Sequence, residues 1–119
     1  MAPEALTGKK KNVHPGLDIW AMGCILYAMV CGALPFTEPS NKKTVERIIT
    51  GDLRFPPKIE PTLSREVKDL ISRMLVVDYN ERYNLSDIMN HEWMNNRKLY
   101  HFKWSFFFYS IALNYKKKL

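Results

Sequence analysis

The fold is decided by one nearly continuous apolar run, DIWAMGCILYAMV at residues 18–30. A helix that is apolar on every face belongs in the middle of a core, so we expect this run to be a central helix covered on all sides. The run is too short to span a bilayer. Asp18 is suited to cap the start of the helix and Gly32 to end it.

Three further helices are expected after this run. The strongest periodicity in the chain follows Ser64, a favourable cap, with apolar side chains at i, i+3, i+4, i+7 and i+8 from residue 67 to residue 75. Residues 41–50 form a second candidate helix that Gly51 would end. Its apolar side chains are expected on one side; they are Val45, Ile48 and Ile49.

The last expected helix begins at Asn84 or Ser86 and carries Ile88, Met89 and Trp93. Residues 1–16 are expected to form a loop, since glycines and Pro15 interrupt them. Residues 54–57, with two consecutive prolines, are expected to be extended. The elements together predict an all-α fold.

The net charge of +6 does not indicate a nucleic-acid partner. Lysine triplets at residues 9–11 and 116–118 account for the excess, and the other 12 basic residues balance the 12 acidic ones. No basic face with interleaved aromatic residues remains. We therefore expect the triplets to be solvated.

Residues 98–119 form an aromatic and basic tail without an assigned domain. Its uncharged stretch is too short to cross a bilayer, and we do not favour a membrane partner. The alternatives that stay open are a membrane-surface segment, a strap packed on the preceding helices, and a segment with no evolved role.

The cysteines and histidines indicate neither a disulfide nor a metal site. Cys24 and Cys31 would lie about 10 Å apart on a helix, too far for a disulfide, so reduced thiols in a cytoplasmic or nuclear protein are expected. The N-terminus shows no signal-peptide pattern. The three histidines have no ligands at suitable spacing, so no metal site is expected. They are His14, His91 and His101.

Several short motifs occur in a specific order: Ala2-Pro3-Glu4, the DIWAMG of residues 18–23, Leu34-Pro35-Phe36, Arg82 and His91-Glu92-Trp93. In this order and spacing the chain resembles the C-terminal part of the large lobe of eukaryotic protein kinases. The serine/threonine type is indicated, most like the calcium/calmodulin-dependent or AMP-activated groups. Residues 1–97 are assigned to this partial kinase domain.

The resemblance implies structural roles for seven residues. It implies a buried ion pair between Glu4 and Arg82, which would hold the end of the activation segment to a remote turn. Asp18, Trp20 and Gly23 belong to the central helix, where the family's aspartate holds the catalytic loop. Without that loop we expect Asp18 to rearrange or face solvent. The remaining two, His91 and Trp93, match the motif that closes the domain.

The chain departs from the family at two positions. Tyr79 and Glu92 stand where the family usually has proline. Both departures leave the local turn geometry open.

The resemblance also implies a docking region for substrates or regulators near Pro35–Gly51. The family transfers phosphate from ATP with magnesium, using a glycine-rich loop, a lysine and two aspartates. None of these motifs occurs in the sequence, so no catalytic, cofactor-binding or metal residue is assigned, and the chain alone is expected to be inactive. Two alternatives remain: a non-catalytic interaction module, and half of a split kinase that binds the missing kinase portion.

Overall fold

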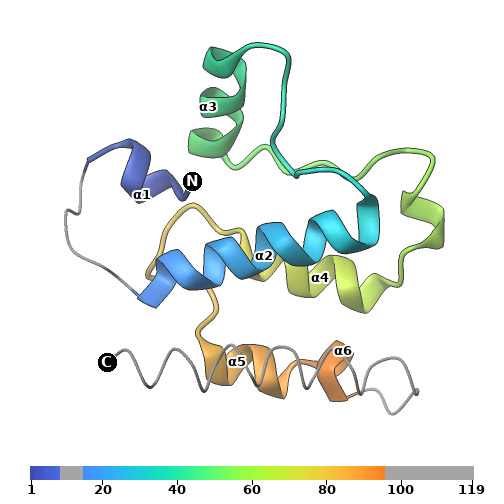
Figure 1. Cartoon of the computed structure of the whole chain (residues 1–119). Helices are drawn as coiled ribbons and strands as arrows, with labels where there is room; N and C mark the ends of the chain where they lie inside the picture. Colours follow the sequence, from blue (N-terminus) through green and yellow to red (C-terminus); the bar gives the residue numbers. More distant parts are fainter. Residues whose placement is uncertain (9–14, 96–119) are drawn as a thin grey trace. The chain divides into compact units, whose positions relative to one another are not determined.

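The computed structural model describes residues 1–8 and 15–95 (Figure 1). These residues form helices and connecting loops without a strand, so the predicted all-α class is confirmed. The chain divides into two compact units, Met1–Asn84 and Leu85–Leu119. Within the described residues, every helix is too short or too polar to cross a membrane.

The central element of the first unit is α2, Pro15–Cys31. It begins before Asp18, because proline is well accommodated in the first turn of a helix. Gly32 follows with φ of 73°, and its N–H bonds to the carbonyl of Ala28. One part of the α2 surface is deeply buried, including Ile19, Trp20, Met22, Leu26 and Tyr27.

The expectation that α2 is covered on all sides is not met by the described residues. Ile25 and Met29 lie four positions apart on α2, and 42% and 52% of their surfaces are exposed. Side chains with this spacing share a helix face. An apolar stripe of α2 is therefore open in the part of the chain that the structure describes.

The helix α4, Arg65–Met74, packs against α2 (Figure 1). The hydroxyl of Ser64 accepts a hydrogen bond from the N–H of Val67 at 3.2 Å, which confirms the predicted cap. Gly23 allows the two helices to approach, since a Cβ atom there would lie 2.8 Å from Leu75 Cδ2. The apolar side chains expected on one face of α4 are buried; they are Val67, Leu70, Ile71 and Met74.

The helix α3, Asn41–Thr50, has the predicted bounds, and Gly51 ends it with φ of 69°. The N–H groups of Gly51 and Asp52 bond to carbonyls of the last turn. The three apolar side chains expected on one side of α3 are covered to different extents. Ile48 is buried and Val45 half-buried, whereas 41% of the Ile49 surface is exposed.

Residues 1–16 are not wholly a loop as expected, because Pro3–Leu6 form the short helix α1. Pro3 occupies its first turn, where a missing N–H costs nothing. The carbonyl of Ala2 accepts hydrogen bonds from Ala5 and Leu6, so the chain turns helical before Gly8. α1 contacts α3. Residues 54–56 have no helical structure, as predicted, and a single turn of 3-10 helix, η1, spans Glu60–Thr62.

Residues 85–95, the described part of the second unit, contain two short helices where one was expected. They are α5, Leu85–Asn90, and α6, Glu92–Asn95. His91 separates them, and its ring Nδ1 accepts a hydrogen bond from the N–H of Trp93 at 3.1 Å. This side-chain acceptor caps the second helix locally. The predicted tail at 98–119 lies outside the described residues.

Candidate functional site

The most completely formed site is the ion pair between Glu4 on α1 and Arg82 in the turn after α4. Arg82 Nη1 lies 2.7 Å from Glu4 Oε1, and Nη2 lies 3.0 Å from Oε2. The side chain of Arg82 is fully buried and that of Glu4 is 4% exposed. The expected buried ion pair is present with bidentate geometry, and it joins two segments 78 residues apart.

Arg82 also donates to three backbone carbonyls. Its Nη1 lies 2.7 Å from the oxygen of Gly16, and its Nε and Nη2 lie 2.9 and 3.3 Å from those of Val76 and Val77. The guanidinium carbon lies 5.0 Å from the centre of the Trp20 ring. One side chain therefore connects α1, the start of α2 and the loop after α4.

The turn that presents Arg82 is held by Asp78. The carbonyl of Asp78 accepts hydrogen bonds from the N–H groups of Glu81 and Arg82, both at 3.0 Å. Its carboxylate accepts a third from the N–H of Asn80 at 2.9 Å. Aspartate commonly stabilises turns in this way. Tyr79, where the family usually has proline, is half-buried in this turn.

Asp18 and Trp20 occupy very different environments although they lie in the same turn of α2. Asp18 is exposed, which is one of the two outcomes expected for it, and its position in the first turn suits the helix dipole. Trp20 is 2% exposed and stacks on Phe36 with ring centres 5.4 Å apart. Trp20 thus links the Arg82 cluster to the turn that follows α2.

Sequence reasoning missed Arg47, which organises the Pro35–Gly51 region. Its guanidinium pairs with Glu38 at 3.1 Å and donates to the carbonyls of Pro35 and Asp52. Its Cζ also lies 5.9 Å from the centre of the Phe36 ring. The only signal in the sequence is a basic residue in the last turn of a helix, which is favourable there in any protein.

Two kinds of pKa shift occur in the first unit. Hydrogen bonds from Arg54 lower the pKa of Asp52, and the charges of Arg54 and Arg47 act in the same direction. Burial raises the pKa of the thiols of Cys24 and Cys31. Both thiols are free, and a raised pKa makes a thiol a poor nucleophile at neutral pH.

His91 and Trp93 belong to the second unit, where both are buried. Glu92, the other departure from the family, is the first residue of α6 and is exposed. In the described residues no group of three or more His, Cys, Asp or Glu side chains is arranged to hold a metal ion. The arrangement of Glu4, Arg82 and Trp20 is suited to fixing the backbone.

A model of the protein kinase domain matches residues 1–94. The chain belongs to the protein kinase family. The range of the match and the helices of the described residues agree with the C-terminal part of the large lobe of such a kinase.

The curated relatives include serine/threonine kinases of several groups. The chain is 42% identical over 93 residues to serine/threonine-protein kinase SIK2 of Gallus gallus, an alignment that covers 78% of this chain and 11% of that protein. It is 37% identical over 98 residues to calcium-dependent protein kinase 3 of Oryza sativa subsp. japonica, covering 82% of this chain and 17% of that protein. The chain therefore spans between a tenth and a fifth of the length of these relatives.

A solved structure has the same fold. The twitchin kinase region from C. elegans superposes with a TM-score of 0.71 at 27% sequence identity. The match covers 78% of this chain and 16% of that chain.

Proposed function

We propose that this chain supplies a supporting part of the large lobe of a serine/threonine protein kinase. The reaction of the complete domain would be transfer of a phosphoryl group from ATP, with magnesium, to a serine or threonine hydroxyl of a protein. The Glu4–Arg82 pair is the observation that carries this proposal. It fixes the Ala2-Pro3-Glu4 segment, which the family resemblance identifies as the end of the activation segment, to a buried framework.

The 119 residues alone are proposed to be inactive. Phosphoryl transfer requires groups that hold the phosphates and the metal and a group that orients the nucleophile. The sequence contains none of the motifs that supply them, and ATP and magnesium would be bound by other parts of a complete domain. The residues described here would act by holding the backbone on which those parts rest.

A chimera tests this role directly. The part of the kinase domain of Gallus gallus SIK2 that precedes the segment aligned with this chain would be joined to residues 1–119. We expect the chimera to transfer phosphate from radiolabelled ATP to a generic protein substrate, and the chain alone to transfer none. Transfer by the isolated chain, or a cooperatively folded chimera without activity, would contradict the proposal.

Two variants of the chimera show whether the ion pair carries the support. Glu4→Gln should remove most of the activity, because the segment that Glu4 holds would lose its charged contact with Arg82. Asp69→Asn is the matched control, since it removes a carboxylate from an exposed pair with Arg73 on α4. Equal activity in the two variants would exclude a special role for the Glu4–Arg82 pair.

Docking of a protein substrate or regulator near Pro35–Gly51 is the second proposed function. Leu34, at the edge of this region, is 62% exposed, and Arg47 holds the loop behind it to both Glu38 and Asp52. A rigid loop next to an exposed apolar side chain loses little entropy when a partner binds. The Leu34→Ala chimera should therefore phosphorylate a docking-dependent substrate more slowly and a short peptide at an unchanged rate.

The split-kinase alternative is favoured by the open apolar stripe of α2. Ile25 and Met29 are exposed in the described residues, and a stripe of this kind marks a surface that a partner covers. The missing kinase portion, added in trans, is the proposed partner. Without it, we expect the folded chain to bind the dye ANS and to aggregate at high concentration, whereas a chain that binds no ANS and stays monodisperse at high concentration would favour the stand-alone module. The free thiols of Cys24, which is half-buried, and Cys31, which is buried, are compatible with the proposed location in the cytoplasm or nucleus.

A further inference from the structure

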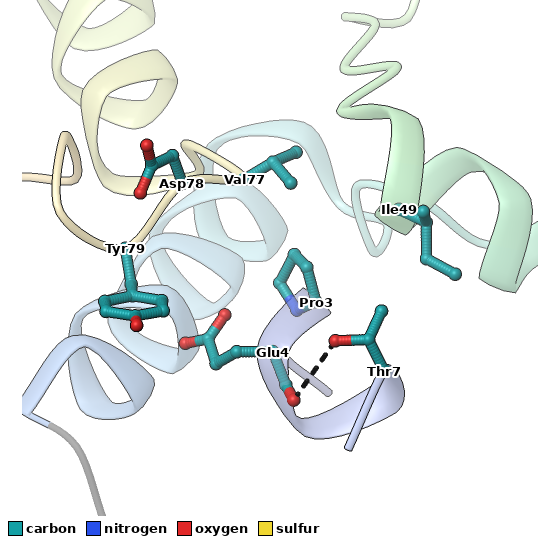
Figure 2. Close-up of a pocket in the computed structure, with 7 residues that line it drawn as sticks. All are labelled: Pro3, Glu4, Thr7, Ile49, Val77, Asp78 and Tyr79. Atoms are coloured by element: carbon teal, nitrogen blue, oxygen red, sulfur yellow. Dashed lines mark hydrogen bonds between the residues drawn. The ribbon is translucent and has the colours of Figure 1, made fainter. Parts of the chain in front are cut away.

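A cavity of about 340 Å³ lies between α1, α3 and the loop after α4. Figure 2 shows its lining, which includes Pro3 and Glu4 from α1, Thr7 directly after α1, and Ile49 from α3. Val77, Asp78 and Tyr79 line it from the loop. The volume is at the lower end of the range of ligand pockets, about 300–1,000 Å³.

Two of the lining residues, Glu4 on α1 and Val77 in the loop after α4, are held in place by other contacts. Glu4 is fixed to Arg82 by two hydrogen bonds, and Arg82 also binds the carbonyl of Val77. The side chain of Val77 lies close to Gly51, where a Cβ atom would meet Val77 Cγ2 at 2.8 Å. Thr7 donates to the carbonyl of Glu4 at 3.4 Å (Figure 2). The cavity is therefore formed before any partner binds.

The cavity is lined mainly by apolar side chains, and one exposed acidic residue, Asp78, lies at its edge. Pro3, Ile49 and Val77 offer carbon surface, and 41% of the Ile49 surface is exposed at the edge. The charge of Glu4 is offset by Arg82, whereas Asp78 is exposed and takes part in no ion pair of the described residues. Among the described residues that line the cavity there is no lysine or arginine. An apolar group that carries a cation beside it would complement this lining.

We propose that the cavity docks a segment of a partner protein that inserts one apolar side chain and places an arginine or lysine beside Asp78. The hydrogen bond from Asn80 to Asp78 holds the carboxylate in position before docking. The cavity shares Ile49 with the Pro35–Gly51 region but is otherwise built from α1 and the loop after α4. The inference goes beyond the proposed kinase function, and its test involves no phosphate transfer.

The test uses the full chain and short synthetic peptides. The probe is acetyl-Gly-Phe-Arg-Gly-amide, titrated while the backbone amide shifts of Thr7, Ile49 and Val77 are followed by NMR. We expect saturable shifts at these residues. Replacing the phenylalanine of the peptide by alanine should weaken binding about tenfold or more, because the buried side chain supplies most of the affinity.

Protein variants separate the charge from the apolar contact. Asp78→Asn keeps an oxygen for the Asn80 hydrogen bond but removes the charge, and it should weaken binding about two- to fivefold. Glu46→Gln, an exposed acid on α3 outside the lining, is the matched charge control and should change nothing. Ile49→Ala should weaken binding, and Leu34→Ala should not.

A preference of the cavity for an acidic peptide over the basic one would contradict the proposal most directly. Lys9, Lys10 and Lys11 follow Thr7 closely in the sequence, so the peptide acetyl-Gly-Phe-Glu-Gly-amide is included. Tighter binding of this acidic peptide, unchanged binding by Asp78→Asn, or the absence of shifts at the lining residues would overturn the proposal.

Discussion

Replacing Glu4 by glutamine tests whether the Glu4–Arg82 pair is a buried structural contact. The substitution keeps the shape of the side chain and removes its charge. The guanidinium of Arg82, which is fully buried, would keep its three carbonyl partners but lose its counter-charge. Breaking a buried ion pair lowers the free energy of unfolding by about 3–5 kcal/mol. Because Arg82 retains its carbonyl contacts, we expect a loss of about 3 kcal/mol for Glu4→Gln.

Urea unfolding followed by far-UV circular dichroism measures this cost. For a small domain the dependence on urea is about 1–3 kcal/mol per molar, so about 3 kcal/mol lowers the midpoint by roughly 1.5 M if the slope is about 2. The matched control is Asp69→Asn, which breaks an i,i+4 pair whose side chains are 53% and 46% exposed. That control should cost only about 0.3–0.5 kcal/mol.

Comparing Glu4→Gln with Asp69→Asn shows whether the Glu4–Arg82 pair contributes to stability as a buried contact. If Glu4→Gln lowers the midpoint no more than Asp69→Asn, the pair behaves as a surface contact and the reasoning from burial is refuted. Arg82→Met is a less useful variant, because it also removes the donor for the carbonyls of Gly16 and Val76. Its cost approaches the lower end of the total stability of a domain, about 5 kcal/mol, so the chain would fail to fold.

Three further predictions concern other parts of the first unit. Gly23→Ala should lower the unfolding midpoint, because a Cβ atom 2.8 Å from Leu75 costs about 1–3 kcal/mol of overpacking against about 1 kcal/mol of gained helix propensity. Arg54→Gln should raise the pKa of Asp52 in an NMR titration of its carboxyl carbon, since Arg54 supplies the largest cause of the lowered pKa. Because the pKa of Asp52 is lowered in the wild-type chain, its ionised carboxylate stabilises the fold above about pH 3.9, and this stabilisation is lost as the pH falls further. The Arg54→Gln variant should therefore lose less stability on acidification than the wild-type chain. Cys24 should react slowly with iodoacetamide at pH 7 in the native chain and quickly in urea, because burial raises its pKa.

The helices that could be predicted are those whose signals are local. The spacing of apolar residues and the cap at Ser64 both lie within α4, and Gly51 provides a left-handed end for α3. α1 was missed because its start depends on the carbonyl of Ala2, which accepts two hydrogen bonds. A backbone acceptor of this kind cannot be inferred from the residue types. The break at His91 was missed for a similar reason, since a ring nitrogen there accepts the N–H of Trp93.

The site could be predicted only in part, because its contacts are remote in sequence. Glu4 and Arg82 are 78 positions apart, and only the family resemblance connects them. Arg47 was missed since its partners depend on how the loop after Pro35 folds back. The exposure of Asp18 was expected from the absence of donors for its carboxylate. The exposure of Ile49 was not, because periodicity assigns a face to a side chain but does not show whether another element covers it.

The Glu4–Arg82 pair and phosphate transfer have different requirements in this chain. All the acceptors that bind Arg82 in the structure lie between Glu4 and Val77, so the pair can form from these residues alone. Catalysis, in contrast, would require motifs that the sequence does not contain. Loss of the pair should therefore reduce the stability of the isolated chain, and it should reduce both the stability and the activity of the chimera. If the chimera with Glu4→Gln were destabilised yet fully active below its melting temperature, the pair would be a stabilising contact without a part in supporting phosphate transfer.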